Sequence, residues 1–304
     1  MADVGIIVVT YNSGAEIGKC LDAAQRTGAE IVVIDNASID GTTDEVVKRN
    51  VRLIANRENR GFACAVNQGF SALNTRYVLL LNPDAVISGS LDALRDACDL
   101  AGSAGAGGCL KDAAGRLQLG FMVRALPTPA ALVLEALLLN RIWPGNPVNR
   151  NYRCLDWNYS VRSEAEQPAG AFLMVRRAVW QELGGMDERF VPVWFEDVDF
   201  CRRIRDRGLK LYYVPEAVAV HTGGHSIPQL GVEMRSFYWY RSLLRYSAKH
   251  FRPMAFRAVC MAVVTGSVFR SIGESLRHRN LRPLAAYARV MRFAGRGLLF
   301  GSLG

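Results

Sequence analysis

Short apolar runs alternate with helix-like segments through the first third of this chain, and this alternation restricts the fold more than any other feature. The runs that have the composition of buried strands are Gly5–Val9, Ile31–Ile34, Val51–Ile54 and Tyr77–Leu81. The helical patterns lie at residues 15–25, 42–48, 62–73 and 91–101. Continuous apolar strands between helices indicate a mainly parallel sheet that is covered on both faces. We therefore expect an α/β fold.

Polar residues directly follow three of these predicted strands. They are Thr10-Tyr11-Asn12, the segment from Asp35 to Gly41, and Asn82-Pro83-Asp84. In such sheets, ligands bind beyond the carboxyl ends of the strands. The Asp35 carboxylate suits hydrogen bonds from a nucleobase or ribose, but it equally suits a turn or a helix cap. An aspartate such as Asp84 is common in turns. Mg²⁺ commonly binds only one or two protein carboxylates, with phosphates and waters completing its coordination shell, so Asp84 also fits a metal ligand.

An acidic cluster flanked by aromatic residues, Trp194-Phe195-Glu196-Asp197-Val198-Asp199, precedes a helical pattern at residues 200–205. Burial among aromatic residues raises carboxylate basicity, so a general base or metal ligand fits here. A helix also favours acids in its first turn for purely structural reasons. His221 ends a later predicted strand; it is either a structural histidine or a metal ligand that works beside a carboxylate and phosphate oxygens.

The middle of the chain gives weaker signals. Glycines make residues 102–124 look irregular, and residues 127–143 have the pattern of one apolar helix before a Pro-Gly-Asn-Pro break. Strands are expected at residues 169–175, 209–214 and 217–221. The early glycine in the first of these, Gly170, permits close approach of a ligand or another part of the chain.

Composition limits the class of protein. At 304 residues, half of them hydrophobic, the chain has enough apolar material for a large core. Seven scattered cysteines without CxxC spacing argue against a disulfide framework or a zinc cluster, and favour a reducing cytosol. We see no basic leader at the N-terminus. No apolar run reaches the roughly 18 residues of a membrane span; residues 258–269 come closest.

The positive charge is concentrated at the C-terminal end. The net charge is +9, and from Met234 onward 13 Lys and Arg face one acid, Glu274, so this tail carries 13 − 1 = +12 and the remainder +9 − 12 = −3. Arg241, Arg245 and Lys249 recur at helical spacing beside aromatic residues. This pattern fits a helix packed on the protein body, or one that contacts an anionic membrane. We predict two domains, 1–230 and a basic, helical, membrane-associating extension at 231–304.

Several motifs occur in an order that resembles one known family. They are Val8–Asn12, Val33–Thr42, Asn59–Ala63 with Asn67–Gly69, Leu80–Asp84, Gly170–Leu173, Gly185–Phe190, Phe195–Asp199, and His221 with Gly223, Gly224 and Ser226. Together they resemble the family 2 glycosyltransferases of GT-A fold, and among these the rhamnosyltransferase-like branch. The resemblance runs from about Val4 to Phe251. It implies a Rossmann-like, mostly parallel sheet between helices, here with the basic C-terminal extension.

The resemblance also implies roles for individual residues. Residues expected at the nucleotide-sugar site are Thr10, Tyr11, Asn12, Asp35, Asn59, Gly61, Asn67, Asn82 and Asp84. Asp84 ends the DXD-type motif, whose first acid is here Asn82, and it binds Mg²⁺ or Mn²⁺ with His221 as a further contact. Asp197 is the catalytic base, and Glu196 is a catalytic neighbour that contacts donor or acceptor sugar.

The activity that the resemblance implies is inverting transfer of a sugar from a nucleotide-diphosphate donor to a hydroxyl. The favoured donor is dTDP-L-rhamnose and the favoured acceptor a glycan or polyprenyl-diphosphate-linked sugar of the cell envelope, at the inner face of the plasma membrane. A UDP- or GDP-sugar donor and a non-catalytic membrane scaffold remain alternatives. A sugar nucleotidyltransferase requires a Gly-rich basic loop after the first strand, which residues 10–14 lack. Nucleic acid is not an expected partner, since no nucleic-acid-binding module is recognised.

Overall fold

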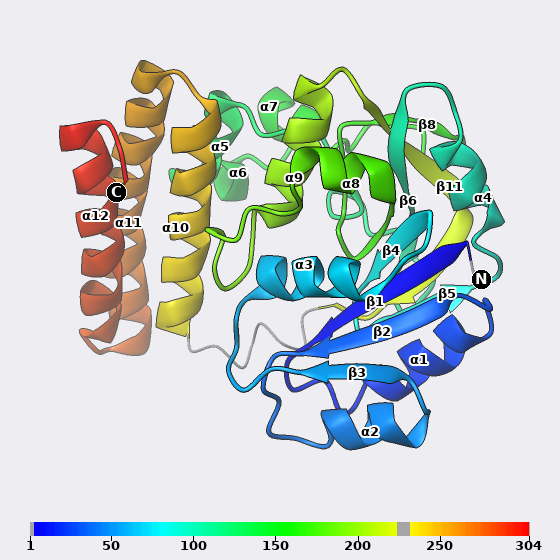
Figure 1. Ribbon diagram of the computed structural model, residues 1–304. Coiled ribbons are helices and arrows are strands. Elements are labelled where there is room, and N and C mark those ends of the chain that lie inside the picture. Colours follow the sequence, from blue (N-terminus) through cyan, green and yellow to red (C-terminus); the bar gives the residue numbers. More distant parts are fainter. Residues whose placement is uncertain (1–2, 224–231, 304) are drawn as a thin grey trace. The chain divides into compact units, whose positions relative to one another are not determined.

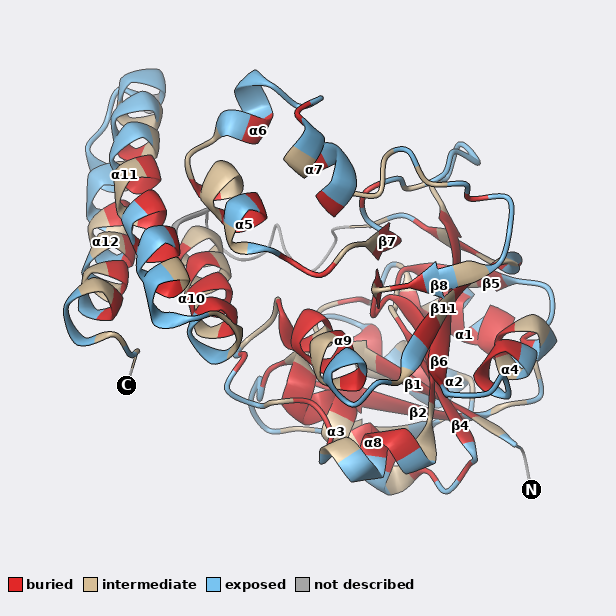
Figure 2. Ribbon diagram, turned by 90° about the horizontal axis from the view of Figure 1, so that it is seen from above, coloured by how far each residue is buried: buried red, intermediate tan, exposed pale blue. Residues whose placement is uncertain are grey.

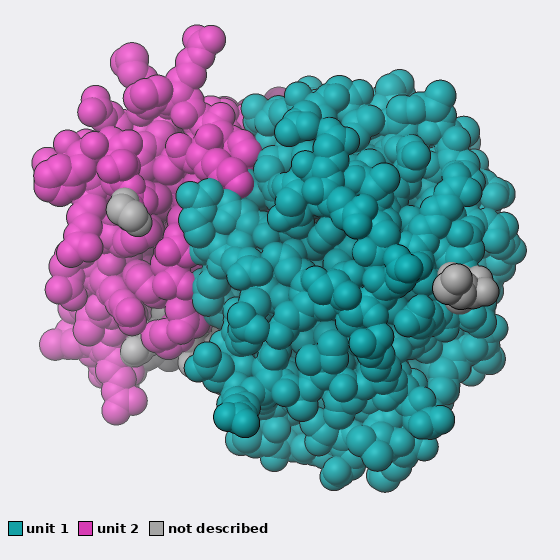
Figure 3. Space-filling view, viewed as in Figure 1, with its two compact units in different colours: residues 1–126, 153–192, 196–226 teal, residues 127–152, 193–195, 227–304 magenta. Residues whose placement is uncertain are grey.

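The computed structural model of this protein describes residues 3–223 and 232–303, and the chain divides into two compact units (Figures 1 and 3). Unit 1 comprises residues 1–126, 153–192 and 196–226, and unit 2 comprises residues 127–152, 193–195 and 227–304. The segment 127–152 thus belongs with the C-terminal helices, whereas the sequence assigned it to the first domain. The prediction that the C-terminal unit associates with membranes stays a prediction.

Unit 1 is built on a mixed, largely parallel sheet, which confirms the predicted α/β class. Its described strands are β1 (Val4–Thr10), β2 (Glu30–Asp35), β3 (Arg52–Ala55), β4 (Tyr77–Leu81), β5 (Ala85–Ser88), β6 (Ser103–Lys111), β8 (Ser163–Ala165), β10 (Phe172–Arg176) and β11 (Lys210–His221). The order is β3-β2-β1-β4-β10-β6-β11-β5, with β8 also paired to β11. Neighbours are parallel from β3 to β4 and between β6 and β11, while β10, β5 and β8 run antiparallel. A small ribbon joins β7 (Val123–Arg124) and β9 (Gln167–Pro168).

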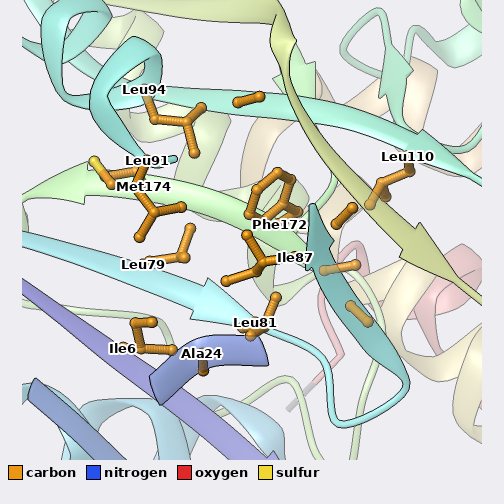
Figure 4. Packing of buried hydrophobic residues seen from close by; sticks show 14 of the residues in the cluster. Ile6, Ala24, Leu79, Leu81, Ile87, Leu91, Leu94, Leu110, Phe172 and Met174 are labelled. Atoms are coloured by element: carbon orange, nitrogen blue, oxygen red, sulfur yellow. The ribbon is translucent and has the colours of Figure 1, made fainter. Parts of the chain in front are cut away.

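Helices cover both faces of this sheet. They are α1 (Ile17–Gln25), α2 (Thr42–Lys48), α3 (Phe62–Ala72), α4 (Asp92–Cys98), α8 (Arg177–Leu183) and α9 (Glu196–Asp206). Ile6 belongs to a core cluster that includes residues of α1 and α4 (Figure 4). Its neighbour Ile7 meets Gly69 of α3 on the other face. Trp180 of α8 stacks on Phe70 and packs against Phe200 of α9. Each fully buried Val, Leu or Ile contributes about 1.5–3 kcal/mol.

Three local predictions were wrong. Residues 103–111 form the long strand β6, because the close neighbours of β6 require glycine: a Cβ on Gly105 would lie 2.3 Å from the carbonyl oxygen of Met174. The predicted helix at 127–143 is two helices, broken at Leu138, whose φ is 66°. The predicted strands at 209–214 and 217–221 are one strand, β11, with a register irregularity between Val214 and Val218.

Unit 2 is helical. Its helices are α5 (Pro129–Ala136), α6 (Leu139–Ile142), α7 (Pro147–Tyr152), α10 (Val232–His250), α11 (Pro253–His278) and α12 (Arg282–Phe300). The last three confirm the predicted helical tail. Among the described residues, one stretch, Pro253–Arg277, has the length and composition to cross a membrane, although the sequence analysis found no such run. A helix packed within a protein passes the same test.

Candidate active site

The predicted loops gather at one edge of the unit 1 sheet. Thr10 and Asp35 are register partners at the carboxyl ends of β1 and β2. Asn82 follows β4, the other neighbour of β1, and its amide N–H donates to the carbonyl of Ala171 (3.0 Å). His221 is the last residue of β11 and pairs with Ala85, the residue after Asp84. The parallel topology therefore brings four separate polar segments together.

Asp35 is buried and holds the first two loops together. Its carboxylate accepts hydrogen bonds from Thr10 Oγ1 (2.8 Å), from the Ser38 amide (2.9 Å) and from Ser38 Oγ (2.5 Å). Asn12 joins the same network. Its backbone N–H donates to Ser38 Oγ (2.8 Å), and its side-chain Oδ1 accepts from the backbone N–H of Ile39 (2.8 Å). The protein itself thus occupies both oxygens of Asp35. Tyr11, which stands between Thr10 and Asn12 in the sequence, is half-exposed.

Asn59 and Gly61 shape the turn before α3. Asn59 Oδ1 accepts from the Gly61 amide (2.9 Å), and Gly61 has φ of 85°, a backbone conformation that suits glycine. The carbonyl of Gly61 accepts from Asn36 Nδ2 (3.2 Å), which ties the turn to the loop after β2. Asn67 has a different place: its side chain donates to and accepts from the backbone of Met186 (3.0 Å each). Its amide therefore fixes the 185–188 turn.

Asp84 and His221 form a buried pair. The Asp84 Oδ1 to His221 Nε2 distance is 3.4 Å, and both side chains are buried. Burial acts to raise the pKa of Asp84, but the hydrogen bond and charge of His221, together with backbone donors, outweigh it and lower that pKa below its ordinary value. Asn82 Nδ2 also lies 3.3 Å from His221 Nε2. The lowered pKa favours the ionised form of Asp84, which could then bind a cation.

Gln118, which the sequence analysis did not identify, orients His221. Gln118 Nε2 donates to the backbone carbonyl of His221 (2.7 Å), and Gln118 Oε1 lies 2.9 Å from His221 Nδ1. Because the carbonyl fixes which end of the amide is NH₂, Nδ1 must carry the proton that Oε1 accepts. In the neutral ring the lone pair is then on Nε2, the nitrogen that faces Asp84, whereas in the cationic ring Nε2–H donates to Asp84. Phe121 stacks on the imidazole ring, with centroids 5.2 Å apart.

The donor set around Asp84 fits a divalent cation that a nucleotide diphosphate helps to bind. No group of three or more His, Cys, Asp or Glu side chains placed to hold a metal occurs in the described parts of the chain. Mg²⁺ commonly takes only one or two carboxylates, with phosphates and waters completing the shell. Two adjacent donors, each about 2.1 Å from one ion, lie about 3–4 Å apart. The 3.4 Å spacing of Asp84 and His221 falls in that range.

The acidic cluster starts α9 after an unusual backbone conformation. Trp194 and Phe195 have φ of 80° and 70°, which bulky residues adopt rarely and mainly where the surroundings hold them. Glu196 and Asp197 follow as the first residues of the helix. Asp199, two residues on, is fully buried and paired with Arg203 (2.8 Å), so it is structural.

The two leading carboxylates differ in their surroundings. Glu196 is 4% exposed, and its Oε2 has no hydrogen-bond partner among the described residues. Burial, with a smaller effect of the Asp197 charge, raises the pKa of Glu196 far above its ordinary value. Asp197 is partly exposed and accepts hydrogen bonds from the amides of Gly170 (3.2 Å) and Val198 (2.8 Å) and from Gln167 Nε2 (3.3 Å). Burial still raises its pKa, while these amides oppose the shift.

This asymmetry assigns different chemistry to the pair. Burial favours the protonated form of Glu196, whereas Asp197 has the donors that stabilise an ionised carboxylate with raised basicity. Gly170 allows the approach, since a Cβ there would lie 3.2 Å from that of Asp197. The next residue, Ala171, accepts from the Asn82 amide, so a short stretch of backbone joins the base candidate to the Asp84 loop. The edge can bind a diphosphate and accept a proton.

Comparisons with known proteins show which family this chain resembles. The model of the family Glycosyl transferase family 2 matches residues 5–96. An N-acetylglucosaminyl-diphospho-decaprenol L-rhamnosyltransferase from Mycobacterium tuberculosis is 30% identical over 290 residues, covering 82% of this chain and 90% of the relative. The Escherichia coli rhamnosyltransferase WbbL is 32% identical over 82 residues, which is 27% of this chain and 30% of that protein.

A solved structure shows the same fold. The mannosyltransferase PcManGT from Pyrobaculum calidifontis, in complex with GDP-Man and Mn²⁺, superposes with a TM-score of 0.52 and 17% identity, covering 99% of this chain and 88% of that one. At that identity the likeness concerns the fold alone. The relative from M. tuberculosis is aligned over 90% of its own length at 30% identity, and the family model matches the region from β1 into α4. The chain therefore belongs to glycosyl transferase family 2.

Proposed function

We propose that this family 2 glycosyltransferase moves L-rhamnose from dTDP-L-rhamnose to a hydroxyl of a polyprenyl-diphosphate-linked sugar, with inversion. The M. tuberculosis relative, named for L-rhamnose transfer to a decaprenol-linked acceptor, aligns over 90% of its length and supports this choice. The basic C-terminal helices favour work at an anionic membrane surface, on the cytoplasmic side where nucleotide sugars are made available. Cell-envelope polysaccharide is the product class.

The observation that carries the proposal is the unequal pair Glu196 and Asp197. In the reaction, Asp197 accepts the proton of the acceptor hydroxyl, and that oxygen bonds to the anomeric carbon as the bond to the diphosphate oxygen breaks. One displacement from the opposite face inverts the anomeric configuration. Glu196 keeps its proton and serves as a hydrogen-bond donor to a sugar.

Asp84 and His221 are the residues that would hold the divalent cation. When bound, Mg²⁺ or Mn²⁺ supplies positive charge that stabilises the departing diphosphate. Gln118 would keep Nε2 of His221, the nitrogen that faces Asp84, as the atom that binds the cation. Asp35, Thr10, Asn12 and Tyr11 shape the pocket for the nucleoside, and Asn59 and Gly61 present the turn nearest to it. Asn67 acts by holding residues 185–188.

The test is donor binding and hydrolysis across dTDP-rhamnose, UDP-sugars and GDP-sugars, with and without Mg²⁺ or Mn²⁺. We expect metal-dependent selection of dTDP-rhamnose by the wild type, and its loss in Asp84→Ala. Asp44→Ala is the matched control, because Asp44 is an exposed carboxylate on α2. Selection of a UDP- or GDP-sugar would replace the donor but keep the activity. Binding of no nucleotide sugar would favour a non-catalytic scaffold.

A further inference from the structure

Helix α11 has an exposed apolar side that runs along most of its length. We call it the α11 stripe and define it as Met254, Met261, Val268, Phe269, Ile272 and Leu276. These positions recur at seven, seven or eight, and three or four residues, so they share one side of an α-helix. Met254 is 83%, Phe269 63% and Leu276 75% exposed. Figure 2 shows exposed positions recurring along α11. From residue 254 to 276 the stripe is about 33 Å long.

The opposite side of α11 is committed to unit 2. Phe256, Val259 and Val263 are buried there. Helix α5 approaches so closely that a Cβ on Gly266 would overlap the carbonyl oxygen of Ala136. Helix α12 packs along α11 as well. Because this contact needs glycine, α11 cannot rotate to bury the stripe without losing its packing. The stripe therefore faces outward within unit 2.

The charges around the stripe select its partner. Arg257 and Arg277 are exposed at its borders, and Arg252 and Arg279 lie just beyond the two ends of the helix. On the neighbouring helix α12, Arg282, Arg292 and Arg296 are exposed, while Arg289 lies over the ring of Phe237 of α10. Glu274, the one acid after residue 233, is engaged by the hydroxyl of Tyr287 (3.0 Å). An apolar side with cationic borders complements an anionic lipid surface, with acyl chains against the stripe and phosphates against the guanidinium groups.

We propose that α11 lies flat in the headgroup region of an anionic bilayer, with the stripe inserted. A spanning orientation would place both sides of α11 in lipid, but one side packs on α5 and α12 and contains the buried residues Ser267 and Ser271. The inference deepens the proposed function and rests on it for its purpose, which is access to a lipid-linked acceptor. Ile142 at the end of α6 and the following residue, Trp143, add a second exposed apolar edge to unit 2.

The sequence pointed to a different helix. It singled out Arg241, Arg245 and Lys249 on α10 as a cationic stripe. In the structure, Arg241 is half-buried and stacks over Phe237 (5.6 Å) and Tyr238 (5.1 Å), and burial lowers its pKa. Leu243, Leu244 and Tyr246 of α10 are fully buried. The exposed lipid-binding side is therefore on α11, and α10 is an inner helix of unit 2.

The first experiment is sedimentation of the full chain with vesicles of phosphatidylcholine alone or with 30–50% phosphatidylglycerol, about the range used to mimic anionic membranes. We expect the wild type to bind the anionic vesicles, and Met261→Glu/Phe269→Glu to lower the partition coefficient at least about tenfold. Val47→Glu/Val161→Glu, which adds the same charges at exposed apolar sites of unit 1, should bind like wild type. Equal binding by all three proteins, or no binding by the wild type, would overturn the proposal.

Depth measurements separate a flat helix from a spanning one. Spin labels on cysteines introduced at positions 254, 261, 269 and 276 should report one shallow depth from oxygen and nickel-complex accessibility, after subtraction of the wild-type background. A steady increase in depth from 254 to 276 would reject the flat orientation. Wild-type dimers that become monomers in the double glutamate variant, seen by light scattering, would instead assign the stripe to a second copy of the chain.

Activity is measured separately, so that the results distinguish a wrong membrane contact from a wrong proposed function. With a short-chain, water-soluble acceptor, the double glutamate variant should turn over like wild type, while with the acceptor in anionic vesicles it should slow at least about tenfold. Equal rates with the vesicle acceptor would reject the stripe as the membrane contact. Absence of turnover in every protein, together with stripe-dependent vesicle binding, would reject the proposed function alone.

Discussion

The Asp35 network and the acidic start of α9 both bury carboxylates in unit 1, but they satisfy them in opposite ways. Asp35 receives three hydrogen bonds from Thr10 and Ser38. Glu196 has an oxygen without a partner in the described structure, while Asp197 accepts three hydrogen bonds but is partly exposed to solvent. A carboxylate that is fully buried and satisfied by its own protein acts as a brace, whereas one that is satisfied but still reached by solvent can react. One left unsatisfied costs free energy, and proteins tolerate that mainly at functional sites.

The largest effect should come from Asp197→Asn. Removing the base while keeping the shape should lower kcat by about 10²–10⁴, with the Kd for the donor changing less than about threefold because Asp197 acts on the acceptor. Single-turnover kinetics and donor titration measure the two quantities. In the wild type, kcat/KM should rise with pH as Asp197 loses its proton, and the raised pKa puts that limb above the range of an ordinary aspartate.

Replacing Asp35, which we expect to act as a structural brace, should lower kcat less than replacing the base. If Asp35→Asn lowered kcat as much as Asp197→Asn while both proteins kept wild-type donor affinity, the distinction between brace and base would be lost. Retained turnover in Asp197→Asn would reject Asp197 as the base directly.

A substitution of Gln118 tests the second buried carboxylate, Asp84, whose partner is His221. Replacing Gln118 by Met removes both hydrogen bonds to His221 and keeps the side-chain length, so the imidazole loses its fixed tautomer. Loss of such an outer partner weakens metal binding about 10–100-fold. Mn²⁺ titration followed by electron paramagnetic resonance, with nucleotide diphosphate present, measures the affinity.

Nitrogen NMR of the histidine rings supplies the reading that a general loss of packing would not mimic. We expect the wild-type His221 signals of a protonated Nδ1 and an unprotonated Nε2, and a mixture of tautomers in Gln118→Met. Leu119→Met, an exposed neighbour in the same loop, should leave both the spectrum and the Mn²⁺ affinity unchanged. An unchanged tautomer in Gln118→Met would rule out the orienting role.

The smaller effect of Asp35→Asn should be on stability. The amide places an NH₂ group against the donors of Thr10 or Ser38, so one buried hydrogen bond is lost at a cost of about 1–3 kcal/mol. Chemical denaturation measures this free energy of unfolding. Thr10→Val, which removes one donor to the same carboxylate, should cost less. Equal stability of Asp35→Asn and wild type would show that the network does not brace the loops.

Local patterns predicted the parts of this molecule that depend on neighbouring residues. The β1, β2 and β4 strands follow from continuous apolar runs, and the polar residues after them reach one edge because parallel strands share their direction. Gln118 gave no such signal, since its partner His221 is 103 residues away. The strand β6 was not predicted, because its glycines are required by close contacts with residues distant in the sequence, namely the carbonyl of Met174 and the ring of Phe172.

The unequal character of Glu196 and Asp197 was also beyond the sequence. The two acids are neighbours with the same charge, and a helix start predicts both equally. Only the folded environment separates them, since Gly170 and Gln167 donate to Asp197 while Glu196 Oε2 receives nothing from the described residues. Similarly, Leu138 adopts a left-handed backbone conformation, which the conformational preference of leucine does not predict.

The smallest effect, a gain in stability, should come from Glu196→Gln. The raised pKa means that folded Glu196 keeps its proton above about pH 4.5, where the unfolded chain releases it, so its contribution to stability falls as pH rises. Glutamine removes this dependence. The melting temperature should thus exceed that of wild type by a few degrees at pH 8, and the difference should shrink towards pH 5. Exposed Glu216→Gln is the control. A constant difference across pH would contradict a protonated Glu196.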